Sequence, residues 1–297
     1  MQSGKLMSAL IGAVVIAAPV FGQDDNSDQN DFTLEVFGGL TYSDNVAVPQ
    51  LDASSGVGDF AATLDASVGF KTDIFANTKL DIGYDFGQIR YLDETAFNQQ
   101  QHSFTAGLAY ELADGIDLGL DGGYYLTMLG GDKFLTQTRF SPSIARMFGD
   151  ATYVRASWAY TDIDFEDIDS RDGENHTVGI DSYVFLTDEG YVNFGVFYEK
   201  ESTEVVDFSY DGYVLSAGAQ VPFLDTTFNA SLDYNKRDYD GLEDRNDDRV
   251  TFKAGIETDL FAVLTLKPEY TYRDVSSNVD QFSYKEHVIS VKLGYVF

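Results

Sequence analysis

The sequence predicts an all-β protein, an up-and-down antiparallel transmembrane β-barrel of about fourteen strands. From residue 32 to the end, apolar and polar residues alternate, which places the two kinds of side chain on opposite faces of a strand. Turns of a few residues alternate with longer polar loops, as in barrels whose ends face different compartments. The final segment, 286–297 (EHVISVKLGYVF), alternates strictly and ends on an aromatic residue. Together these features predict strands whose apolar faces point outward around a polar interior.

The first residues have the features of a secretory signal peptide. Lys5 precedes an apolar run that ends at Phe21, so we expect residues 1–22 to be removed by cleavage. Residues 23–31 (QDDNSDQND) are polar and acidic, which predicts a disordered linker. The barrel domain then occupies residues 32–297.

Strands are expected where the alternation is uninterrupted and a turn or loop sequence bounds it. The expected strands are 32–42, 60–70, 79–90, 102–112, 116–128, 136–148, 152–160, 176–186, 191–199, 213–223, 227–235, 249–258, 263–273 and 286–297. Segments of about ten residues suit a tilted crossing of the bilayer. Pro142 and Pro268 fall inside expected strands. Because proline cannot donate the ladder hydrogen bond, we expect a bulge or local distortion at each.

Composition narrows the classes of function. The formal net charge is −30 and the sequence pI is about 4.1, which disfavours nucleic acid as a partner. The absence of cysteine excludes disulfides and thiolate metal sites. Aromatic residues make up 14% of the chain, which argues against general disorder. No cofactor is expected.

Charged residues within the strands fall mainly on the face opposite the apolar residues. A Lys or Arg that faced lipid near the midplane would cost about 2–4 kcal/mol, so we expect the charged face to line a lumen. The expected lumen-lining residues are Glu35, Asp65, Asp81, Asp85, Glu111, Asp117, Asp121, Arg139, Arg155, Asp181, Lys253, Lys267, Arg273 and Lys292. Acids dominate the first five strands, and most bases lie on the sixth, the seventh and the last three.

Two interpretations of this lumen follow from the residues. A water-filled pore with an acidic arc would favour cations or neutral polar solutes over anions. Alternatively, the charges pair across neighbouring strands and plug a narrow lumen. A plugged lumen would suit a structural or export-associated barrel, such as an adhesin or an accessory to surface-protein or polysaccharide secretion.

Outward aromatic residues gather near the strand ends, where such rings mark both interfaces of a membrane. The expected girdle residues are Tyr42, Phe60, Phe70, Phe104, Tyr110, Trp158, Tyr160, Tyr213, Phe252, Tyr295 and Phe297. The three histidines, His102, His176 and His287, open strands after long loops. We expect them in the outer interfacial belt.

Metal binding and enzyme activity find little support in the sequence. The acidic segments 162–175 and 238–248 have the composition of calcium loops but not the spacing of an EF-hand. We therefore predict no specific metal site at these acids, although divalent cations could bridge them to lipid phosphates. His102 and Ser103 are adjacent in a strand, so they point to opposite faces and cannot form a catalytic dyad.

Three segments carry a resemblance to known proteins: GLTYSDNV at 39–46, FNQQQHSFTAGLAYEL at 97–112 and SYKEHVISVKLGYVF at 283–297. Through them the chain resembles the outer-membrane β-barrel porins of Gram-negative bacteria and the barrel portion of surface-lipoprotein assembly modifiers. The resemblance implies an integral outer-membrane protein in contact with outer-membrane lipids and lipopolysaccharide. It also implies insertion by the barrel-assembly machinery, which reads the C-terminal strand, and passive diffusion of small polar solutes.

Overall fold

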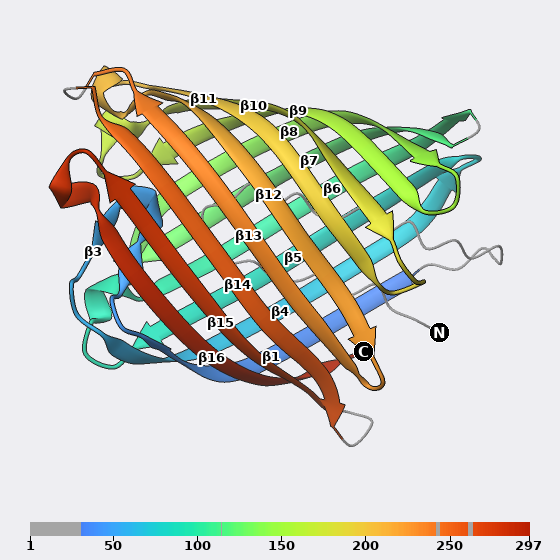
Figure 1. The fold of residues 1–297 in the computed structure, drawn as a ribbon, viewed down its shortest axis with the longest axis horizontal. Helices are drawn as coiled ribbons and strands as arrows, with labels where there is room; N and C mark the ends of the chain where they lie inside the picture. Colours follow the sequence, from blue (N-terminus) through green and yellow to red (C-terminus); the bar gives the residue numbers. More distant parts are fainter. Residues whose placement is uncertain (1–30, 114, 242–243, 261–263) are drawn as a thin grey trace.

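The computed structural model describes residues 31–113, 115–241, 244–260 and 264–297, which form a closed antiparallel barrel (Figure 1). The expected signal peptide and nearly all of the expected linker lie outside the described residues. Among the described residues, no helix is both long and apolar enough to cross a membrane.

The barrel strands follow one another around the wall in chain order. They are β1 (Asp31–Ser43), β4 (Asp59–Phe75), β5 (Thr78–Tyr91), β6 (Gln99–Ala113), β7 (Ile116–Leu129), β8 (Asp132–Phe148), β9 (Thr152–Phe165), β10 (Gly173–Phe185), β11 (Tyr191–Thr203), β12 (Tyr210–Phe223), β13 (Thr226–Tyr239), β14 (Asn246–Leu260), β15 (Leu264–Ser277) and β16 (Tyr284–Val296). The connections at one end carry β2 (Ala47–Val48), β3 (Ala53–Ser54), η1 (Pro49–Leu51), η2 (Thr95–Phe97), η3 (Asp169–Arg171), η4 (Val206–Phe208) and η5 (Asp280–Phe282).

The expected number and order of strands are confirmed, but the expected loops are too long. Most strands continue past their apolar alternation, because the backbone ladder goes on where the side chains become polar. In β9, for example, Asp162 pairs with Glu174 and Asp164 with Thr136, inside a segment expected as loop. The connection between β7 and β8 is a tight turn, whose two glycines, Gly130 and Gly131, have φ of 65° and 107°.

The last residue of the chain closes the barrel. The N–H of Phe297 donates to the carbonyl oxygen of Leu34 at 2.9 Å, and the N–H of Leu34 donates back at 3.0 Å. The pairing of β1 with β16 continues from Glu35 opposite Val296 to Ser43 opposite Val288. The first and last strands therefore leave no open edge between them, which a membrane-spanning sheet requires.

Alternation along each strand separates a lipid-facing surface from the interior. Leu40 is 70% exposed on the outer face, whereas its neighbour Thr41 is buried and its hydroxyl donates to the carbonyl oxygen of Ile289. The two prolines also behave as expected. The pairing of β8 with β9 is interrupted beside Pro142, and that of β14 with β15 beside Pro268. Each proline keeps its pairing with the strand on its other side.

Candidate functional site: the lumen and its extracellular mouth

The register places every residue expected to line the lumen on the inner face of its strand. These are Glu35, Asp65, Asp81, Asp85, Glu111, Asp117, Asp121, Arg139, Arg155, Asp181, Lys253, Lys267, Arg273 and Lys292. The acids gather on β4 to β7, and most of the bases lie on β8, β9 and β14 to β16. The inner wall is therefore divided by charge.

The acidic side contains carboxylates that make no direct ion pair. Lys71 pairs with Asp81 at 3.1 Å, Nζ to Oδ2. Among the described residues, no basic side chain comes within 4.0 Å of Asp85 or Asp121. Because an ionised carboxylate without a base in contact needs water or a counter-ion, these acids favour a wet lumen.

The basic side is cross-linked by ion pairs that reach across strands. The Nζ of Lys292 on β16 lies 2.7 Å from Oδ2 of Asp65 on β4, so the pair spans the intervening strand β1. Gly39 of β1 leaves the space for this contact, since a Cβ there would lie 2.8 Å from Cγ of Lys292 and 2.9 Å from Oγ1 of Thr63.

Two further groups of charges are paired on the inner wall. Arg155 holds Asp181 of the neighbouring strand through two N–H···O hydrogen bonds, each of 3.1 Å. The Nζ of Lys267 lies 3.4 Å from Glu257 and 3.8 Å from Glu35. Part of the lumen charge is therefore neutralised locally, as the second interpretation of the sequence expects.

The inner wall is hollowed near the end of the barrel that carries the short turns. A hollow of about 600 Å³ lies there between the β4–β5 turn and the strands β6 and β7. Lys79, Glu111 and Asp117 line it. In an outer-membrane barrel this end faces the periplasm.

The outer wall carries the expected girdle residues. They are Tyr42, Phe60, Phe70, Phe104, Tyr110, Trp158, Tyr160, Tyr213, Phe252, Tyr295 and Phe297, all exposed or half-buried on outward positions. Each histidine contacts an aromatic side chain of the preceding strand: Nδ1 of His102 lies 2.9 Å from the hydroxyl of Tyr84, and Nδ1 of His287 lies 2.7 Å from that of Tyr270. His176 stacks on Trp158 at an interplanar angle of 18°.

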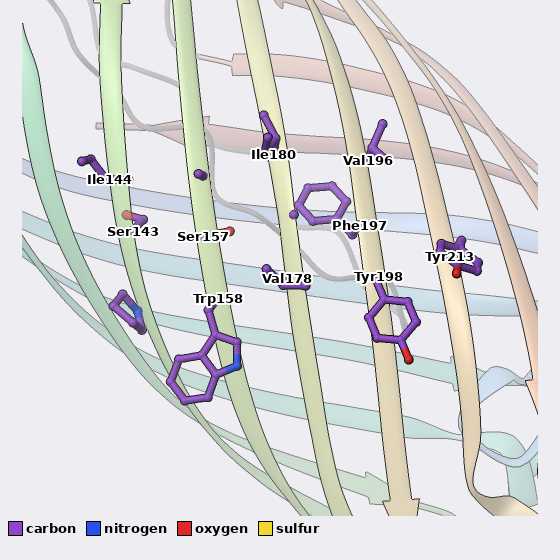
Figure 2. A pocket seen from close by; sticks show the side chains of 13 residues that line it. Ser143, Ile144, Ser157, Trp158, Val178, Ile180, Val196, Phe197, Tyr198 and Tyr213 are labelled. Atoms are coloured by element: carbon purple, nitrogen blue, oxygen red, sulfur yellow. The ribbon is translucent and has the colours of Figure 1, made fainter.

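The outer wall is also hollowed across β8 to β12, as Figure 2 shows. Trp158, Ile180 and Val196 line this depression of about 720 Å³, together with Tyr198 and Tyr213. It is apolar and faces away from the lumen. It therefore lies outside any path that a polar solute could follow.

The first loop, residues 44–58, crosses the lumen at the other end of the barrel, which faces outward from the cell. It leaves β1 and carries the small sheet β2–β3 (Figure 1). Leu51 of this loop packs against Leu135, Ile163 and Phe165 on the inner faces of β8 and β9. Those strands stand roughly opposite β1 in the order of the barrel. The first loop therefore spans the extracellular mouth.

Arginines at the mouth converge on one carboxylate of the first loop. The Oδ1 atom of Asp52 lies 2.8 Å from Arg249, and its Oδ2 atom lies 3.1 Å from Arg245 and 3.8 Å from Arg171. We call Arg171, Arg245 and Arg249 the arginine cluster. Asp52 is 5% exposed. Its burial opposes ionisation, but the attraction of Arg249 and the surrounding arginines outweighs this and lowers the pKa of Asp52 to about 2.

The arginine cluster is itself fixed by its neighbours. Arg245 lies between two rings, with its guanidinium carbon 4.0 Å from the centroid of Tyr239 and 3.6 Å from that of Phe282. Asp247, which is 0% exposed, accepts hydrogen bonds from both Arg245 and Arg249. These contacts hold the guanidiniums in place before any ligand arrives.

The sequence predicted a long loop between the first two strands, but sequence reasoning missed the path of this loop across the mouth and missed the arginine cluster. Asp52 and Arg245 lie outside the expected strands, and Arg171 lies in a loop expected to be acidic and solvated. A signal was present: the first loop contains the apolar residues Val46 and Val48, which an exposed loop does not need. Both are buried. Within the described residues, no group of three or more His, Cys, Asp or Glu side chains is placed to hold a metal ion.

Comparisons with known proteins agree with this architecture. The family model described as "Putative beta-barrel porin 2" matches residues 224–296. The outer-membrane channel DcaP of Acinetobacter baumannii has a similar fold, with a TM-score of 0.56 at 11% identity over 90% of this chain and 97% of that one. The chain therefore shares the closed antiparallel β-barrel fold of these outer-membrane channels.

Other solved barrels are similar to the same extent. OmpT, an outer membrane protein of Vibrio cholerae, gives a TM-score of 0.55 at 11% identity, and the match covers 93% of this chain and 100% of that chain. The anion-selective porin of Comamonas acidovorans gives 0.53 at 8% identity, covering 91% and 99%. At these identities the likeness concerns the fold alone. No curated protein sequence matches this chain.

Proposed function

We propose that the barrel is a channel for passive diffusion of small polar solutes, that it favours cations or neutral solutes over anions, and that it is not an enzyme. The observation that carries this proposal is the pair of lumen carboxylates, Asp85 and Asp121, which have no base within 4.0 Å among the described residues. Such carboxylates attract cations and repel anions at close range. The hollow beside Lys79, Glu111 and Asp117 at the end with the short turns adds polar space to the same wall.

Single-channel recording in a KCl gradient tests the ion preference. We expect a reversal potential that indicates K⁺ preference, and a smaller preference in the double variant Asp85→Asn/Asp121→Asn. Asp162→Asn is the matched control, because Asp162 is an exposed acid on the outer face of β9. A reversal potential of the anion-selective sign in the unaltered protein would contradict the proposal. Swelling of proteoliposomes in sugars of graded size then gives the size limit for solutes.

A plugged, structural or export-associated barrel remains the second candidate, because the first loop spans the mouth and several lumen charges are paired. The two candidates differ in what happens when the first loop is shortened. Replacement of residues 46–57 by Gly-Gly creates a large conductance if the loop alone restricts a wet lumen. Silence of both the unaltered and the shortened protein in bilayers would favour the structural barrel.

A further inference from the structure

The contact between the first loop and the arginine cluster has the chemistry of a ligand complex. One carboxylate, that of Asp52, contacts three guanidiniums: Arg171 of η3, Arg249 of β14, and Arg245, which immediately precedes β14. Arginine recognises carboxylates through planar, charge-assisted hydrogen bonds, and its charge does not vary with pH in the ordinary range. The arginine cluster is therefore shaped for an oxyanion of the size of a carboxylate.

The arginine cluster also has more donors than its own acids use. Three guanidiniums face two carboxylates, those of Asp52 and Asp247. Arg245 is 1% exposed, yet its Nη1 atom has no hydrogen-bond partner, and the same is true of Nε of Arg249. Buried donors without acceptors are costly. A ligand with more acceptor oxygens than the single carboxylate of Asp52 could satisfy them.

We propose that the arginine cluster is a binding site for a small organic carboxylate, and that Asp52 occupies it as an internal substitute for that ligand. The side chain of Asp52 ends in CH₂–COO⁻, the same group that a short aliphatic acid presents. A solute that replaces Asp52 removes the ionic attachment of the first loop to η3 and β14. The loop then keeps only its apolar contacts, such as those of Leu51.

An external carboxylate has to compete with Asp52 for the arginine cluster. Because Asp52 is part of the same chain, its carboxylate acts at an effective concentration in the millimolar range or above. An external carboxylate must overcome this, so its apparent affinity for the unaltered protein is low. Asp52→Asn removes the internal competitor. Asparagine also suits the backbone at this position, where φ is 54°, better than alanine would.

Isothermal titration calorimetry of the purified protein in a non-ionic detergent tests binding. We expect succinate to bind Asp52→Asn at least tenfold more tightly than the unaltered protein, and to lose this binding in Asp52→Asn/Arg249→Ala. Asp280→Asn, an exposed acid in η5, should behave like the unaltered protein. Neutral succinamide should not bind. Absence of succinate binding to Asp52→Asn would overturn the proposal, and tighter binding of inorganic phosphate than of succinate would overturn the assignment to carboxylates.

Thiol labelling tests the displacement of the first loop without relying on conduction. The chain has no cysteine, so Val48→Cys introduces a single reactive group at a side chain that is 3% exposed. We expect succinate to increase its rate of reaction with a soluble maleimide, and Asp52→Asn to increase it without ligand. A rate that neither change alters would show that the loop stays in place and would overturn the displacement step. Both assays remain informative if the proposed transport activity fails.

Discussion

Arg245 and Asp247 at the extracellular mouth are 1% and 0% exposed, whereas the side chains of Lys71 and Asp81 on the acidic wall are 38% and 50% exposed. Both regions contain opposite charges in contact, but water screens only the second. Removing one member of a buried pair leaves an uncompensated charge in a poorly solvated place. The same removal on an exposed wall costs little. The mouth is therefore a fixed structure, whereas the acidic wall around Lys71 and Asp81 is a solvated surface that solutes can approach.

The largest expected effect comes from removing the first loop, which spans the mouth. Replacing residues 46–57 by Gly-Gly takes the first loop out of the mouth and leaves the paired strands β1 and β4 intact. We expect single-channel conductance to rise several-fold, because the mouth no longer restricts the lumen. Val57→Ser, at an exposed position of the same loop, is the control and should leave conductance unchanged. An equal conductance of the shortened and unaltered proteins would mean that the narrowest point lies elsewhere.

The next prediction compares one cation from each region. Arg245→Met should lower the free energy of unfolding or of local opening by about 3–5 kcal/mol, because Asp52 and Asp247 lose a buried partner. Lys71→Met should change it by less than about 1 kcal/mol. Thermal unfolding followed by circular dichroism, together with protease sensitivity of the first loop, measures both. Similar effects for the two variants would remove the distinction between mouth and wall.

A smaller effect is expected at Gly39, which lets Lys292 reach Asp65 across β1. Gly39→Ala places a Cβ 2.6 Å from the carbonyl oxygen of Val291 and against the stem of Lys292. We expect a loss of about 1–3 kcal/mol in unfolding free energy from this crowding. Gly38→Ala is a matched control on the lipid-facing side, where no atom lies within 4 Å of the added group. Equal stability of the two variants would show that the wall adjusts freely.

The smallest expected effect is that of moderate acid on the mouth. The pKa of Asp52 is lowered from 3.8 to about 2, so its ionic attachment is fully present above about pH 4 and is lost only as the pH falls through about 2. The charged groups that act on this carboxylate are Arg249, Arg237, Arg245 and Arg171. Conductance should therefore not increase through opening of the mouth between pH 7 and pH 4. An abrupt increase near pH 5 would contradict this.

The sequence alone determined the barrel, its order of strands and the direction of its side chains. Alternation is a local property, so neighbours such as Leu40 and Thr41 point to opposite faces whichever strand pairs with them. The terminal strand and the lumen-facing acids, including Asp85 and Asp121, were predictable for the same reason. The ends of the strands were not, because a backbone ladder can continue through polar residues such as Asp162.

Only the tertiary structure decided how the mouth is closed. Asp52 and Arg245 are separated by 193 positions in the chain, and no periodicity relates them. Their contact depends on the path of the first loop across the lumen, which in turn depends on the apolar contact of Leu51 with the opposite wall. The pairing of Lys292 with Asp65 likewise required the barrel to close and Gly39 to leave space between them. The alternation of side chains between the two faces of a strand is a property of each strand's own sequence. Contacts between residues on distant strands form only after the barrel has closed.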